Sequence, residues 1–303
     1  MAKKKRKKAG KPKTEVKTEA VKNVGPPPKL PSAWKITKSA WRVVWQNKNL
    51  FIAITLIYGI LSLILVQGIT GGTNISSLKS ELNGSLGSLA SAFSVFTTLI
   101  GSSGNSSSQT AGGYQLPLGV ITSLAIIWAL RQILAGKKAG IRDAYYHGMY
   151  PLVPFVLVIL LIGLQLLPLI IGSTIYNLVV ANGIAVNFFE RMAFLLVFLA
   201  GTVWSIYMIS SSLFALYIVT LPEMTPIKAI RSARELAKGR RWPIILRLIF
   251  LPIVLVVVAA IIMVPIIIVL AVLAKWVFFV LSMFTLVAVN AYLYTLYREL
   301  LNE

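Results

Sequence analysis

The sequence predicts an all-α integral membrane protein with six transmembrane helices and a basic N-terminal arm. Three observations lead to this fold class. The 303 residues are 57% hydrophobic and only 13% charged, too few charges to solvate the surface of a soluble domain of this size. Six stretches reach the roughly 20 apolar residues that a helix needs to cross a bilayer. The basic residues gather on one predicted side of these stretches.

Residues 1–32 form the predicted arm. The chain begins with MAKKKRKKAGKPK, in which eight of 13 residues are Lys or Arg and none is acidic. Residues 10–32 are rich in Lys, Pro and Glu and poor in large apolar groups. Such a segment cannot bury enough surface to offset the entropy of ordering, so we predict that the arm is disordered. Its densest basic run consists of Lys3, Lys4, Lys5, Arg6, Lys7 and Lys8.

The arm has three candidate partners. A polybasic segment beside a first transmembrane helix typically binds the anionic cytoplasmic leaflet or sets the topology, and each basic side chain near the surface contributes ~1 kcal/mol. We favour this interpretation. The same charges suit a ribosome, RNA or DNA, because counterion release does not distinguish one polyanion from another. The third possibility is that residues 3–8 form a nuclear localisation signal.

Residues 33–303 form the predicted transmembrane domain. Its six spans are expected at about 50–69, 116–134, 151–172, 192–220, 244–270 and 276–297. Lys275 and Trp276 mark the predicted turn between the last two spans. The long connection 70–115 carries apolar residues at helical spacing from Leu78 to Ile100, which predicts a helix on the outer face.

The distribution of charge predicts the orientation. With a cytoplasmic N-terminus, the inside segments contain 25 of the 30 Lys and Arg, and the outside segments contain Lys79, Arg191 and Lys275. The remaining two, Arg131 and Arg247, lie near the inner boundary, where long side chains extend to the headgroups. We therefore predict a multi-pass protein of a cell membrane with both termini cytoplasmic. The bacterial cytoplasmic membrane is the location we favour.

A short motif precedes each odd-numbered span. It consists of a basic residue, Ser or Asp, and Ala, and it occurs as Lys38-Ser39-Ala40, Arg142-Asp143-Ala144 and Arg231-Ser232-Ala233. The apolar span begins 10, 7 and 11 residues after the alanine. We predict three repeated units of an interfacial helix and a transmembrane hairpin, at 35–134, 141–221 and 228–297. The alternative is that any cytoplasmic loop collects basic and aromatic residues.

The third copy predicts an amphipathic interfacial helix over 226–238. Thr225 suits the N-cap, Pro226 the first helical position and Gly239 the C-terminal end. An apolar stripe is predicted at Ile227, Ile230, Ala233 and Leu236. A helix of this kind lies in the interface plane and binds anionic headgroups or an acidic partner protein. The candidate binding residues are Lys228, Arg231, Arg234, Lys238, Arg240 and Arg241.

The same region carries a family resemblance. The stretch AIRSARELAKGRRWPIIL resembles the signature of a bacterial six-helix membrane family, whose best-named member is the membrane domain of some glycerophosphoryl diester phosphodiesterases. The matching residues are Ala229, Ile230, Leu236, Lys238, Gly239 and Trp242. The resemblance implies a six-helix architecture over 35–297 but no particular activity, because most members have none assigned. A catalytic barrel of ~250 residues does not fit in this chain, so phosphodiesterase activity is not implied.

The sequence offers little for catalysis. There is no cysteine, and the one histidine, His147, is expected to form hydrogen bonds at the membrane interface. The nine acids lie outside the spans, and no pair has the spacing of an acid–base couple or a metal site. We therefore predict no enzymatic activity, no cofactor and no metal.

Polar and proline residues within the spans leave a second function open. The polar ones are neutral and comprise Gln67, Gln165, Asn290 and the serines at 210–212. Candidate helix breaks are Pro154, Pro168, Pro252 and Pro265. Broken helices mark binding sites in transporters, although membrane helices also tolerate proline. The leading hypothesis is a non-enzymatic membrane protein that organises lipid or partner proteins at the cytoplasmic face, and the alternative is a transporter of small solutes or lipid.

Overall fold

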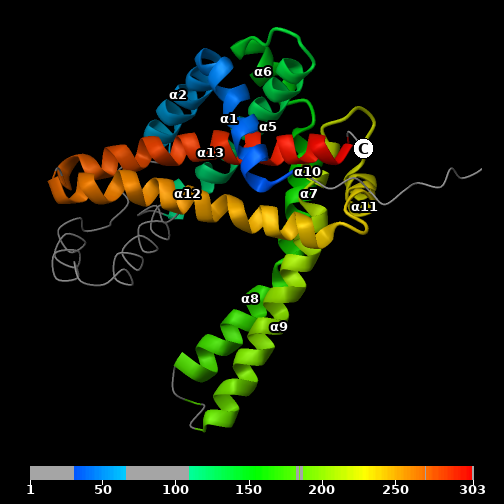
Figure 1. Ribbon diagram of the computed structural model, residues 1–303, viewed down its shortest axis with the longest axis vertical. Helices are drawn as coiled ribbons and strands as arrows, with labels where there is room; N and C mark the ends of the chain where they lie inside the picture. Colours follow the sequence, from blue (N-terminus) through cyan, green and yellow to red (C-terminus); the bar gives the residue numbers. More distant parts are fainter. Residues whose placement is uncertain (1–30, 66–108, 182–183, 185–186, 270, 302–303) are drawn as a thin grey trace, which may run out of the picture. The chain divides into compact units, whose positions relative to one another are not determined.

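The computed structural model describes residues 31–65, 109–181, 184, 187–269 and 271–301 (Figure 1). All regular structure in these residues is helical, and they contain no strand. The predicted all-α class is therefore confirmed for this part of the chain. The arm up to residue 30 and the predicted outer helix over 78–100 lie outside the described residues.

Six helical segments of the described chain are long and apolar enough to cross a membrane. They are Lys48–Leu65, Tyr114–Leu134, Leu152–Val180, Phe188–Ile218, Arg241–Ile266 and Trp276–Leu301. Each overlaps one of the predicted spans, with ends that differ by a few residues. The prediction of six apolar spans is confirmed in this form.

A short helix precedes each pair of spans along the chain. The first group comprises α1 (Ala33–Gln46), α2 (Lys48–Leu65) and α5 (Gln109–Leu134). The second comprises α6 (Ile141–Gly148), α7 (Leu152–Gln165), α8 (Leu167–Tyr176), the π-helical turn η1 (Asn177–Ala181), α9 (Phe188–Ser212) and α10 (Ala215–Ile218). The third comprises α11 (Pro226–Leu236), α12 (Arg241–Val269) and α13 (Ala271–Leu301).

The main core is built around α5 and α13. These two helices contact each other, and α13 also packs against α1, α2 and α12. Figure 1 shows α12 and α13 running side by side. Ile126 and Leu130 of α5 and Leu296 of α13 are fully buried in this core. The short helices α1, α6 and α11 add buried side chains to the same cluster.

Small residues allow close contacts between helices. A Cβ at Gly148 of α6 would lie 3.1 Å from the Cα of Ala125 in α5. A Cβ at Gly201 of α9 would lie 2.7 Å from the carbonyl oxygen of Pro168 in α8. Membrane helices associate through such close backbone approach, because the lipid tails are as apolar as the side chains they would otherwise bury.

Two sequence predictions about the spans need correction. Helix α12 ends at Val269 and α13 begins at Ala271, so Lys275 lies within α13 and not at the predicted turn. Helix α12 also continues through Pro252 and Pro265, which are therefore not helix breaks. Of the four candidate prolines, Pro168 coincides with an interruption, between α7 and α8.

Candidate functional site

The three short helices bury the alanine of the repeated motif. Ala40 in α1, Ala144 in α6 and Ala233 in α11 are 5%, 0% and 0% exposed. The basic residue two positions before each alanine is exposed in all three helices. Each helix therefore docks on the rest of the protein through its alanine and directs the cation outward.

Helix α11 begins and ends as its sequence predicts. Thr225 occupies the N-cap position with an extended backbone, although its side chain makes no capping hydrogen bond, and Pro226 follows at the first position. Gly239 has a φ of 79°, which glycine adopts at little cost. The buried face consists of Ala229, Ile230, Ala233 and Ala237. Ile227, the first residue of the predicted apolar stripe, is 70% exposed and does not belong to this buried face.

The six predicted anion-binding residues fall into two groups. The four within or just after α11, which are Lys228, Arg231, Arg234 and Lys238, are exposed. The other two, Arg240 and Arg241, are half-buried. The guanidinium carbon of Arg241 lies 4.4 Å from the centre of the Tyr207 ring in α9, a cation–π contact. The six arm residues Lys3 to Lys8 lie outside the described chain.

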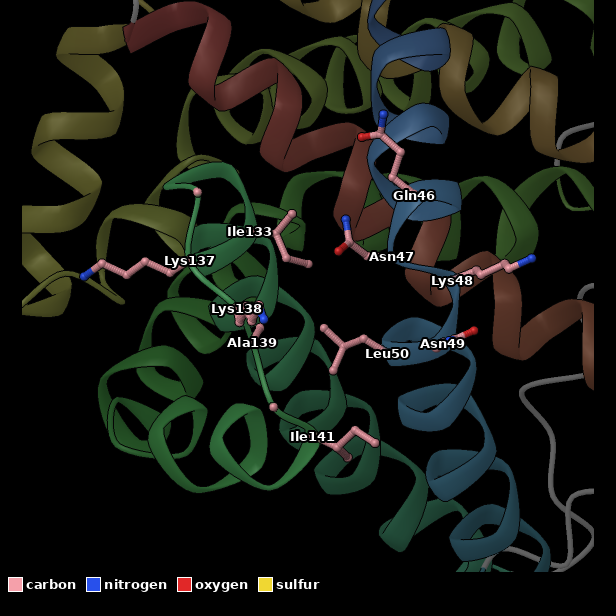
Figure 2. A pocket seen from close by; sticks show the side chains of 12 residues that line it. Gln46, Asn47, Lys48, Asn49, Leu50, Ile133, Lys137, Lys138, Ala139 and Ile141 are labelled. Atoms are coloured by element: carbon pink, nitrogen blue, oxygen red, sulfur yellow. The ribbon is translucent and has the colours of Figure 1, made fainter.

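One pocket lies between the α1–α2 junction and the loop joining α5 to α6. It has a volume of about 830 Å³, and Lys48, Lys137 and Lys138 are among its lining residues. Figure 2 shows Asn47 and Leu50 pointing toward its interior, whereas Lys48 and Lys137 extend away on opposite sides. The ammonium groups of Lys48 and Lys137 therefore do not converge on a ligand in this pocket.

A smaller pocket brings two of the predicted cations together. It has a volume of about 250 Å³ and lies between α9, α11 and α12. Its lining residues are Trp204, Tyr207, Met208, Ser211, Arg234 and Arg241. The aromatic residues of this pocket were not predicted from the sequence. Trp204 and Tyr207 are three residues apart and share a helix face, but nothing in the sequence pairs that face with α11.

Helix α1 presents aromatic residues beside its cations. Trp34, Trp41 and Trp45 are all exposed, and the last two stack with their ring centres 5.8 Å apart. The Nζ atom of Lys48 lies 5.9 Å from the centre of the Trp45 ring. Exposed tryptophans among cations are typical of helices at a membrane–water interface.

Two arginines near the span ends bind backbone carbonyls. Arg131 of α5 donates from Nη1 to the carbonyl oxygen of Thr220 at 3.0 Å and from Nη2 to its hydroxyl. Arg247 of α12 donates from Nε and Nη2 to the carbonyl oxygen of Pro31, at 3.0 and 2.7 Å. Each guanidinium therefore links segments that are distant in the sequence, and the expectation that both side chains extend to the headgroups stays a prediction.

Helix α6 contains the histidine and a partly buried tyrosine. Nδ1 of His147 lies 3.2 Å from the carbonyl oxygen of Asp143, and its ring stacks on Trp128 with centres 5.6 Å apart. Burial raises the pKa of Tyr145 above 10.0, against a smaller opposite effect of its hydrogen bond with Thr122. Within the described residues, no three His, Cys, Asp or Glu side chains are placed to hold a metal ion. The chemistry available here is that of cations, amides and aromatic rings.

The third span is interrupted beside buried polar groups. Helix α7 ends at Gln165, and Pro168 stands near the start of α8. The backbone N–H of Leu169 donates to the hydroxyl oxygen of Ser205 in α9, at 3.2 Å. In the described part of the chain, the side-chain oxygen of Gln165, at the end of α7, is buried without a hydrogen-bond partner. The interruption is thus accompanied by polar atoms that an apolar core would not contain.

By length and composition, the six apolar helices define a multi-pass helical membrane protein. No protein-family model, characterised protein or solved structure matches the chain. The resemblance of residues 229–246 to the six-helix family therefore rests on those residues alone.

Proposed function

We propose that this protein is a non-enzymatic multi-pass membrane protein that binds anionic headgroups and thereby organises lipid or partner proteins at the cytoplasmic face. The docking of α11 is the observation that carries the proposal. Ala229, Ala233 and Ala237 are fully buried against the bundle, whereas the four cations of this helix are exposed. A docked helix holds its cations at a fixed depth in the membrane. At the level of the anionic headgroups, each cation near the surface contributes most to lipid binding.

The charge distribution supports the orientation that this function requires. With both termini in the cytoplasm of a cell, most simply a bacterium, 25 of the 30 basic residues face the anionic leaflet. The run Lys3 to Lys8 adds a second basic segment, for which lipid is the favoured partner and nucleic acid the alternative.

We also propose that the three helix–hairpin units are repeats that share an origin. The order of a short helix and two spans occurs three times, and the motif alanine is buried each time. The resemblance to the six-helix family agrees with this architecture and adds no activity. If the units are repeats, α1 and α6 are further places where cations meet the headgroups.

A charge-removal variant tests the proposed function. Replacing Lys228, Arg231, Arg234 and Lys238 by Gln should lower the enrichment of anionic over zwitterionic lipid in protein purified from membranes. Helix content should stay unchanged by circular dichroism, because all four side chains are exposed. A control that exchanges Lys for Arg, and Arg for Lys, at the same positions keeps the charge and should keep the enrichment. Equal enrichment in all three proteins would contradict the proposal.

The interrupted third span favours the alternative of transport. Gln165 and Ser205 place polar groups at the break between α7 and α8, and broken helices form binding sites in many transporters. Solute uptake and lipid flipping in proteoliposomes distinguish the two functions. The leading proposal predicts no flux above that of empty vesicles, whereas a flux that Gln165→Leu abolishes would establish transport.

A further inference from the structure

The pocket that holds Arg234 and Arg241 lies beside an apolar groove. The groove has a volume of about 540 Å³ and runs along α9. Its lining residues are Leu196, Leu199, Ala200, Val203, Trp204 and Tyr207. Trp204 and Tyr207 line both cavities, so the cationic pocket and the groove are adjacent.

The cationic pocket is suited to a phosphate group. Arg234 comes from α11 and Arg241 from the start of α12, and none of the described lining residues is acidic. The ring of Tyr207 supports the Arg241 guanidinium at 4.4 Å and leaves its charge in place. Two guanidinium groups donate paired hydrogen bonds to phosphate oxygens, a geometry that lysine does not provide.

The groove has the length of one leaflet. From Leu196 to Tyr207 the helix advances eleven residues, which rise ~16 Å, about half of the ~30 Å hydrocarbon core. Arg241 begins the fifth apolar span, so it lies where that span meets the headgroups. Leu196 and Val203 are exposed, and the groove is therefore open to lipid from the side.

We propose that these cavities form one binding site for an anionic glycerophospholipid. Its phosphate lies between Arg234 and Arg241, and one acyl chain follows the groove along α9. The inference rests on the proposed function and deepens it, because it assigns the headgroup recognition to two arginines. A phospholipid carries both the charge and the leaflet-length chain that the cavities require, and a partner helix with a purely apolar face would leave the arginines unused.

Lipid titration of the delipidated full-length protein tests the headgroup contact. Native mass spectrometry counts bound phosphatidylglycerol and bound phosphatidylcholine of the same chain length. The variant R234Q/R241Q should lower the affinity for the most tightly bound phosphatidylglycerol molecule by about tenfold or more, since charge-assisted hydrogen bonds are lost. The control K137Q/K138Q removes the same charge from two exposed lysines of the α5–α6 loop, away from this pocket, and it should change this affinity by less than about threefold.

A second pair of variants tests the groove without touching a charge. Ala200→Phe fills the groove, whereas Val197→Phe enlarges an exposed α9 side chain outside it. The first should lower the affinity for phosphatidylglycerol, and the second should not.

Brominated phosphatidylglycerol should quench tryptophan fluorescence in the wild type more than in Trp204→Phe. Glycerol phosphate, which has no acyl chain, should bind far more weakly than the lipid.

The possible failures can be told apart. If the wild type does not prefer phosphatidylglycerol, the proposed function and this site both fail. If both double variants lose affinity equally, the charges act through a diffuse field, and only the site is overturned. Binding of glycerol phosphate as tight as that of the lipid would overturn the groove. Dimers of the delipidated protein that Ala200→Phe but not Val197→Phe abolishes would assign the groove to a second copy instead.

Discussion

The second and sixth spans differ from the fourth and fifth in how much they bury. In the most apolar window of each span, 44% of the residues are buried in Tyr114–Leu134 and 33% in Trp276–Leu301, but only 6% in Phe188–Ile218 and in Arg241–Ile266. The mean hydropathy runs the opposite way, at 1.6 and 1.9 for the buried pair and 2.1 and 3.1 for the exposed pair. Of these two pairs, the more apolar pair is thus the one that leaves most of its surface for lipid.

This difference follows from the bilayer as a solvent. Lipid tails solvate leucine as well as a protein core does, so apolar side chains give helices little reason to associate. The buried spans instead contribute polar and aromatic groups. Tyr297 of the sixth span stacks on Tyr217 of the fourth with ring centres 5.7 Å apart, and the hydroxyl of Tyr292, also of the sixth span, donates to the carbonyl oxygen of Arg247 at 3.0 Å. Such contacts hold the core, and the apolar faces of α9 and α12 remain open to lipid.

The largest expected effect is on a core leucine. Leu130 of α5 is 1% exposed and Leu196 of α9 is 65% exposed, so Leu→Ala at each position compares the two regions directly. We expect Leu130→Ala to lower the free energy of unfolding by about 2–4 kcal/mol, because it leaves a cavity that the core cannot fill. Leu196→Ala should cost less than about 0.5 kcal/mol in the same detergent. Equal losses in denaturant unfolding would show that α9 is as buried as α5.

A smaller effect is expected where α8 and α9 approach each other. Gly201→Ala places a Cβ 2.7 Å from a backbone carbonyl oxygen, and the helices must separate to accept it. We expect this substitution to lower the free energy of unfolding by about 1–3 kcal/mol. Gly163→Ala in α7 is the control, since no atom lies within 4 Å of its new Cβ and alanine favours a helix. If the two variants unfold at the same temperature, the α8–α9 contact is looser than described.

Periodicity and charge predicted much of this fold. The six spans follow from apolar length alone, and Thr225, Pro226 and Gly239 mark the third short helix because caps are local in sequence. Contacts between distant segments could not be predicted in this way. Nothing in the sequence indicates that Arg247 binds the carbonyl oxygen of Pro31, since every residue offers such an acceptor.

The candidate site was predicted only in part. The sequence predicts the six cations around α11 as a basic cluster, but it does not indicate which of them line a pocket. The structure separates Arg241 from the exposed four by its contact with Tyr207, and it places Arg234 in the same pocket. That selection depends on how α11 packs against α9, and the spacing within either helix carries no information about it.

The measurement that tests the central claim most directly is the sidedness of α11. Headgroup recognition, the role of the arm and the lipid site all require this helix at the cytoplasmic leaflet. Because the chain has no cysteine, single variants Lys238→Cys and Ile184→Cys give unambiguous labelling, and both side chains are exposed. A membrane-impermeant maleimide should label residue 184 in intact cells and residue 238 only in inverted vesicles. Labelling of residue 238 from outside, or of both residues from one side, would contradict the account.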